Sequence, residues 1–103
     1  LLLDEPCAGL DPAARENFLK FIDDLGQVKN APTLILVTHH VEEITPVYSH
    51  ALLLRDGRVL DSGPKQKMLT SRLMADTFRA DVQLRKNSGR HRLEFKPSGG
   101  RAL

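Results

Sequence analysis

Two continuous apolar runs, each followed directly by polar residues, mark the first part of the chain. Leu1–Leu3 leads into Asp4-Glu5, and Thr33–Val37 leads into Thr38-His39. Uninterrupted apolar runs of this length are typical of buried strands in a parallel sheet. The pattern therefore predicts two buried strands, each ending in residues that can carry chemistry.

A helix is predicted between the two runs. Asp11 belongs to the residue types that cap helix N-termini, and Pro12 suits the first helical position. Gly26 predicts the end of the helix. Apolar residues recur between these points at spacings of four and three, on one helical face: Phe18, Ile22 and Leu25. Strand, helix and strand at this spacing predict a βαβ unit with parallel strands and hence an α/β fold.

The predicted topology brings polar residues together at one edge. In parallel α/β sheets, ligands bind at the carboxyl ends of the strands. Asp4 and Glu5 follow the first strand, and His39 follows the second. We therefore expect two carboxylates and an imidazole to converge on one site.

The middle of the chain predicts a short helix and a hairpin. Val41–Tyr48 reads as a short helix that Pro46 ends or kinks. Ala51–Leu54 and Arg58–Leu60 flank Asp56-Gly57, which is a strong signal for a tight hairpin turn.

Helical and hairpin patterns also fill the last third of the chain. Lys65–Phe78 predicts one or two short helices, divided near Thr70-Ser71. Val82–Arg85 and Arg90–Phe95 alternate apolar and polar residues, which predicts a second hairpin. Residues 97–103 are rich in Pro, Ser, Gly and Arg, and are expected to form a disordered tail.

Length and composition narrow the class of protein. The chain has 103 residues, a mass of 11.5 kDa and 41% apolar residues, which allow one small domain or a piece of a larger one. Its start on an apolar run leads us to expect a piece. No apolar run approaches the roughly 20 residues that a membrane-spanning helix needs. Cys7 is a single cysteine, which favours a reducing, cytoplasmic compartment.

Charge divides the chain into an acidic and a basic half. Residues 1–50 carry 3 Lys/Arg against 8 Asp/Glu, and residues 51–103 carry 12 against 5. Basic segments can bind nucleic acid, but single-stranded nucleic acid usually stacks on aromatic side chains. The chain has one Tyr and no Trp, so the basic half is interpreted as solvated surface and no nucleic acid is expected.

Four segments together resemble ABC-type ATPases, a family of P-loop NTPases. Leu1–Pro6 (LLLDEP) resembles the Walker B segment, and Cys7–Asp11 (CAGLD) resembles the D-loop that follows it. Val37–His40 (VTHH) is similar to the switch-histidine loop, and Ala51–Gly63 is similar to the hairpin that comes next in these domains. The four segments stand in the family's order.

The resemblance implies a role for each candidate residue. Asp4 would hold Mg²⁺, through water, and Glu5 would be the general base that polarises the attacking water. His39 would sense the γ-phosphate of ATP. Asp11 would contact an opposing subunit in addition to capping a helix. His40 is the weaker candidate and is expected to pack or face solvent.

Some of these residues also have plain structural interpretations. Asp4 and Glu5 could simply end a strand at a turn, and His39 alone could be an ordinary histidine. Cys7 is interpreted as a small neutral substitute for the Ser or Thr common in the family. Glu42-Glu43 is interpreted as a solvated helix face.

The resemblance also implies what the 103 residues lack. No G-x-x-x-x-G-K-[ST] phosphate loop occurs in them, and neither the Q-loop nor the LSGGQ-type signature is present. Residues 1–96 are thus expected to be the C-terminal portion of an ABC ATP-binding domain, comprising the parallel βαβ unit, a β-hairpin and short C-terminal helices. Such a fragment should be inactive alone, and its first strand should leave an unpaired apolar edge.

The expected function is that of an ABC transporter subunit that binds and hydrolyses ATP. ATP and Mg²⁺ would be its cofactors, and its partners a second ATP-binding domain and a transmembrane permease. The protein would be cytoplasmic and peripheral at the inner face of the cell membrane. The sequence is similar to bacterial ATP-binding proteins of the molybdate or iron uptake type. Two alternatives stay open: an ABC-type ATPase acting on nucleic acid in repair or chromosome maintenance, and a non-catalytic truncated module.

Overall fold

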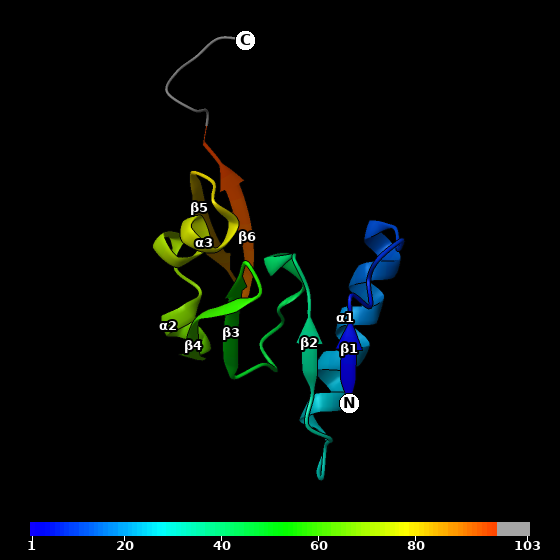
Figure 1. Cartoon of the computed structure of the whole chain (residues 1–103). Helices are drawn as coiled ribbons and strands as arrows, with labels where there is room; N and C mark the ends of the chain where they lie inside the picture. The colour runs from blue at the N-terminus through cyan, green and yellow to red at the C-terminus, as the bar shows by residue number, and fades with distance from the viewer. Residues whose placement is uncertain (97–103) are drawn as a thin grey trace.

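A parallel βαβ unit forms the first part of the chain, as the sequence predicts (Figure 1). β1 (Leu2–Asp4) pairs with β2 (Ile35–Val37), and α1 (Pro12–Gln27) connects them. The structure is a computed structural model that describes residues 1–96; the tail predicted over residues 97–103 lies outside this range. The α/β class is confirmed.

Helix α1 begins where the sequence predicts and ends one residue later. The Asp11 carboxylate accepts a hydrogen bond of 2.8 Å from the N–H of Ala14, which caps the first turn. The predicted apolar face is only partly correct, because the buried residues of α1 are Leu19 and Ile22. Gly26 does not end the helix but lies within it, where its missing side chain leaves room for a neighbouring loop.

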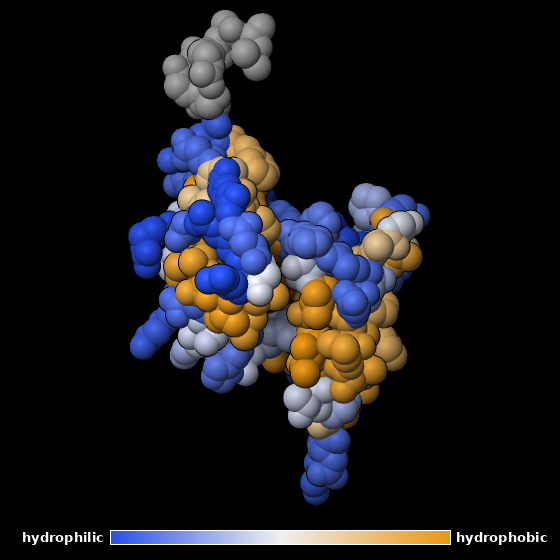
Figure 2. Space-filling view, viewed as in Figure 1, coloured by the Kyte–Doolittle hydropathy of each residue, from blue (hydrophilic) through white to orange (hydrophobic). Residues whose placement is uncertain are grey.

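The two short parallel strands are more exposed than their continuous apolar sequences predict. Leu2 is 64% exposed and Ile35 is 55% exposed, whereas Leu3 and Leu36, on the other face, are half-buried. Within residues 1–96 the sheet has two strands, and the residues on one of its faces are exposed. Figure 2 shows apolar surface over this part of the molecule.

The helix predicted over residues 41–48 is wrong in extent. Only a single 3₁₀ turn forms, η1 (Val41–Glu43). Ile44 already has an extended backbone, with φ −86° and ψ 101°. The stretch that follows contains a β-branched threonine and Pro46, which disfavours helical backbone in the residue before it.

Both predicted hairpins are confirmed. β3 (His50–Arg55) pairs with β4 (Arg58–Pro64) across the turn Asp56-Gly57, whose residues have φ of 54° and 72°, as a two-residue turn of this kind requires. β5 (Val82–Asn87) pairs with β6 (Arg90–Phe95).

The region predicted to hold one or two helices contains two. α2 (Lys65–Met68) and α3 (Ser71–Phe78) are separated at Thr70, whose side chain accepts a hydrogen bond from the N–H of Leu73 and so caps α3. Every helix that the structure describes is too short or too polar to cross a bilayer.

The main hydrophobic core lies between the hairpins, the short helices and η1. Its buried residues come from all of these elements: Val41, Leu53, Met68, Leu69, Leu73, Met74 and Val82. The turn η1 packs against β6, so this core reaches the segment that directly follows β2. The polar edge of the βαβ unit is thereby tied to the rest of the chain.

Candidate functional site

Glu5 and His39 meet at the carboxyl ends of the two parallel strands. His39 Nε2 lies 3.1 Å from Glu5 Oε1, which is hydrogen-bonding distance. An imidazole and a carboxylate at this separation form an ion pair when the imidazole is protonated. The structure brings together the carboxylate and the imidazole that the sequence predicts at this edge.

Backbone geometry fixes where Glu5 leaves the sheet. Its N–H donates to the carbonyl oxygen of Val37 at 2.9 Å, which adds one more bond beyond the strand β1. Glu5 then adopts φ of 49°, a left-handed conformation that is uncommon for a residue with a side chain. The chain therefore turns sharply at Glu5, and the surrounding hydrogen bonds have to hold that turn.

Asp4 and Asp11 take no part in the contact between Glu5 and His39. Asp4 is the last residue of β1, opposite Val37, and is exposed. No hydrogen bond or ion pair to its carboxylate is found within residues 1–96, so the group is open to a ligand. Asp11 uses one carboxylate oxygen to cap α1, and no contact with Glu5 or His39 is found for it in the same range.

Two neighbours of the site, Cys7 and His40, differ in their exposure. Cys7 is buried, and burial raises the pKa of its thiol, with a further rise from the nearby negative charge of Glu43. The thiol is thus neutral at physiological pH. The side chain of His40 is exposed and faces solvent.

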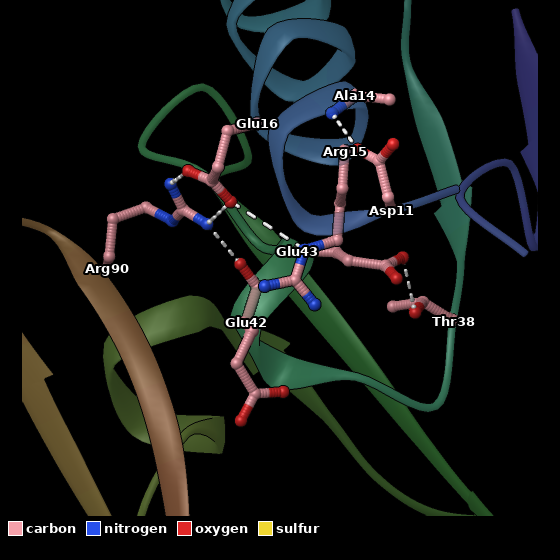
Figure 3. Close-up of polar contacts among 8 residues, drawn as sticks. All are labelled: Asp11, Ala14, Arg15, Glu16, Thr38, Glu42, Glu43 and Arg90. Atoms are coloured by element: carbon pink, nitrogen blue, oxygen red, sulfur yellow. Dashed lines mark hydrogen bonds and ion pairs between the residues drawn. The ribbon is translucent and has the colours of Figure 1, made fainter. Parts of the chain in front are cut away.

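The loop that carries His39 is held by hydrogen bonds that the sequence did not indicate. The hydroxyl of Thr38 donates to Glu43 Oε1 at 2.8 Å (Figure 3). The same hydroxyl accepts from the N–H of His40 at 3.0 Å. Glu43 is only 3% exposed, so its prediction as part of a solvated face is wrong. A spacing of five residues between Thr38 and Glu43 has no sequence signature that could have revealed the pair.

Glu42 is also occupied, but by the last hairpin. Its carboxylate accepts from the N–H of Leu93 at 3.2 Å, and its carbonyl oxygen accepts from the guanidinium of Arg90. Arg90 in turn makes two hydrogen bonds to the carboxylate of Glu16 on α1, of 2.9 and 3.2 Å (Figure 3). One arginine of β6 therefore connects α1 with the segment that follows His39.

The donor set at the edge suits a hydrated Mg²⁺ ion beside a nucleotide. Mg²⁺ prefers oxygen ligands and usually keeps several waters while one or two carboxylates and phosphate oxygens bind it. The free carboxylate of Asp4 next to Glu5 fits that pattern. The residues that the structure describes contain no group of three or more His, Cys, Asp or Glu side chains that could bind a metal alone. Phosphate and water would have to complete the coordination.

The site is an open edge and not an enclosed pocket. A hollow of about 380 Å³ does exist, but its lining includes Gly26, Thr33 and Tyr48. Thr33 precedes β2, so this hollow lies at the amino end of the strand, opposite the end that carries His39.

Comparison with known proteins finds similar sequences among transporter ATPases. The chain is 42% identical over 96 residues to the uncharacterized ABC transporter ATP-binding protein YmeB of Lactococcus lactis, which covers 93% of this chain and 35% of that protein. It is 43% identical over 90 residues to YlmA of Bacillus subtilis, another uncharacterized ABC transporter ATP-binding protein. The alignment covers 87% of this chain and 34% of YlmA. The phosphate import ATP-binding protein PstB 2 of Mycobacterium tuberculosis is 37% identical over 79 residues. The alignment covers 77% of this chain and 28% of PstB 2.

The fold of the chain is also similar to that of a solved ABC transporter structure. It is described as an inward-facing conformation of a metal-chelate type ABC transporter, with a TM-score of 0.73 and 26% identity over 96% of this chain and 39% of that one. No protein-family model matches the chain. The chain spans about a third of the length of the curated relatives it matches. Over that third its sequence is similar to ABC transporter ATP-binding proteins, and its fold matches part of a solved ABC transporter structure.

Proposed function

We propose that this chain supplies part of the ATP-hydrolysing site of an ABC transporter ATP-binding protein. The observation that carries the proposal is the contact of 3.1 Å between Glu5 and His39 at the carboxyl ends of two adjacent parallel strands, next to Asp4. The similar sequences are those of ABC transporter ATP-binding proteins, which supports the same conclusion.

The three side chains divide the chemistry of phosphoryl transfer. Glu5 acts as the general base that orients a water molecule and takes its proton. Its carboxylate is half-buried but still accessible to water, as this role requires. His39 donates from its imidazole to the γ-phosphate and reports its presence. Asp4 would hold Mg²⁺ through water, and the ion would supply positive charge that stabilises the transferred phosphate.

The remaining parts of the site come from outside these 103 residues. We place the chain in the C-terminal portion of the ATP-binding domain, with residues 1–96 as the folded part. The phosphate loop, Q-loop and signature are supplied elsewhere, so the chain alone does not hydrolyse ATP. Asp11 reaches across to a second ATP-binding domain from the start of α1, while its other oxygen caps the helix.

The proposal extends to the transporter as a whole. The ATP-binding protein works with a transmembrane permease at the inner face of the cell membrane. Its substrate class is that of molybdate or iron uptake systems. The similarity in fold to a solved transporter described as metal-chelate type supports this class. Similarity in sequence to the phosphate import protein PstB 2 is the observation that favours another substrate.

The test is Mg²⁺-dependent ATP hydrolysis by the full-length protein that contains this chain. Glu5→Gln keeps the shape and removes the base, so the hydrolysis rate should fall by about 100-fold or more while ATP binding persists. Glu94→Gln, on the exposed side of β6, is the matched control and should hydrolyse at the normal rate. If the unmodified protein neither binds nor hydrolyses ATP, a non-catalytic role replaces this proposal.

A further inference from the structure

Glu43 is a buried carboxylate that lies outside the three residues of the proposed chemistry. It ends the 3₁₀ turn η1 and is 3% exposed. Removing a carboxylate from water is costly unless hydrogen bonds replace the lost hydration. A leucine side chain could fill the same space without that cost, so the buried acceptor oxygens call for an explanation in what they bind.

Its partner is the residue directly before His39. Thr38 donates its only hydroxyl proton to Glu43 Oε1 at 2.8 Å. The same hydroxyl oxygen accepts the N–H of His40 at 3.0 Å, and the carbonyl oxygen of His40 accepts the N–H of Glu43, also at 3.0 Å. The hydroxyl is used in both directions, which fixes its rotamer. The backbone of His39 therefore belongs to a loop that three hydrogen bonds close, and Glu43 takes part in two of them.

The backbone of this loop decides where the imidazole lies. The side chain of His39 is 82% exposed and has Glu5 as its one polar partner within residues 1–96. Packing thus does little to hold the ring, and its position depends on the backbone at residues 38–40. A loose loop would let the imidazole leave Glu5.

We propose that Glu43 is a positioning residue that acts through Thr38 to hold His39 in reach of the γ-phosphate and of Glu5. The proposal rests on the proposed ATP-hydrolysing function. Glu43 itself touches neither nucleotide nor attacking water. Its contribution is to remove the freedom of the loop before ATP arrives, and misplacement of a reacting group by about 1 Å can cost about 100-fold in rate.

Steady-state hydrolysis by the full-length protein that contains this chain tests the proposal. Thr38→Val and Glu43→Leu each break the same hydrogen bond, so each should lower kcat by about 10- to 100-fold and leave the KM for ATP unchanged. The double variant should be no slower than the slower single variant, because both changes remove one interaction. Glu43→Gln keeps an acceptor oxygen and should retain most of kcat.

The neighbouring glutamate provides the matched control. Glu42 belongs to the same turn, but its carboxylate accepts from the N–H of Leu93 on β6. Glu42→Leu should lower the melting temperature and leave kcat unchanged. If Glu42→Leu lowers kcat as much as Glu43→Leu, the effect is general destabilisation and the positioning role is wrong. If Glu43→Leu does not fold, Thr38→Val, which removes one hydroxyl, decides the question.

A background without the imidazole separates positioning from other roles. In His39→Ala, whose residual hydrolysis is measured in a single turnover, Glu43→Leu should cause no further loss. A further loss of the same size would overturn the proposal. If Glu5→Gln and His39→Ala leave hydrolysis unchanged, the proposed function has failed. If they abolish it while Glu43→Leu and Thr38→Val hydrolyse normally, only the positioning role has failed.

Discussion

Gly26 occupies a position in α1 where an added methyl group should destabilise the protein. At an open helical site, Gly→Ala gains about 1 kcal/mol of stability. At Gly26, however, a Cβ would lie 2.2 Å from Val47 Cγ2 and 3.0 Å from Leu34 Cδ1. Carbon atoms in contact are normally about 3.5–4 Å apart, so the loop that contains Val47 would have to move away from the helix.

That movement is opposed by a hydrogen bond and by the side chain itself. The N–H of Val47 donates to the Asp23 carboxylate at 3.0 Å, which holds the loop against α1 less than one turn before Gly26. Val47 is also β-branched and stiff about χ1, so it cannot easily turn its methyl group aside. Overpacking typically costs about 1–3 kcal/mol, and an approach of 2.2 Å to a stiff side chain places Gly26→Ala in the upper part of that range, at about 2–3 kcal/mol. After the helical gain is subtracted, Gly26→Ala should lose about 1–2 kcal/mol.

Thermal unfolding of the full-length protein measures this loss. A fall in the melting temperature of about 2–8 °C is expected for Gly26→Ala in a protein of this size class. Asn17→Ala, on the exposed face of the same helix, is the control and should melt slightly higher. Adding Val47→Ala to Gly26→Ala should recover part of the loss. A Gly26→Ala protein that melts at or above the unmodified protein would refute the reasoning.

Two further predictions concern the last hairpin. Arg90→Met removes the hydrogen bonds to Glu16 and to the carbonyl oxygen of Glu42, and it should lower the melting temperature by several degrees. Lys20→Met breaks an exposed ion pair on α1 and should leave the melting temperature almost unchanged. Equal shifts in the two variants would contradict the role of Arg90 in connecting β6 with α1. Burial lowers the pKa of His91, so the unfolded chain binds more protons than the folded chain at mildly acidic pH. The stability of the folded state should therefore fall as the pH drops below about 6.5, and it should fall less steeply in His91→Gln. Melting temperatures measured between about pH 7.5 and 5.5 test this expectation.

Local sequence patterns predicted most of the secondary structure because short-range physics decides it. The cap at Asp11 needs only the N–H three residues later, and the turn at Asp56-Gly57 needs only two residues that tolerate positive φ. The contact between Glu5 and His39 spans 34 residues, yet it too was predictable, since parallel pairing of two recognisable strands puts their carboxyl ends together.

Burial was harder to predict because it depends on which surfaces meet. Leu1–Leu3 reads as a strand covered on both faces, yet Leu2 is 64% exposed, because the pairing that the structure describes gives a sheet of two strands with one face covered. Gly26 reads as a helix end, yet it is a site of close packing against Val47. The composition of a segment predicts its tendency to be buried, but the elements that pack against it decide how exposed it is.

Glu42 and Glu43 show why the support of a site is less visible in sequence than its chemistry. Two adjacent glutamates after an apolar residue fit a solvated helix face, and nothing nearby in the sequence contradicts that interpretation. Yet the turn is 3₁₀, one glutamate lies inside against Thr38, and the other bonds to a strand about 50 residues later in the chain. A carboxylate can be interior only where donors reach it. Reactive groups are recognisable by type, whereas the groups that hold them are recognisable only by the donors and acceptors that the fold brings to them.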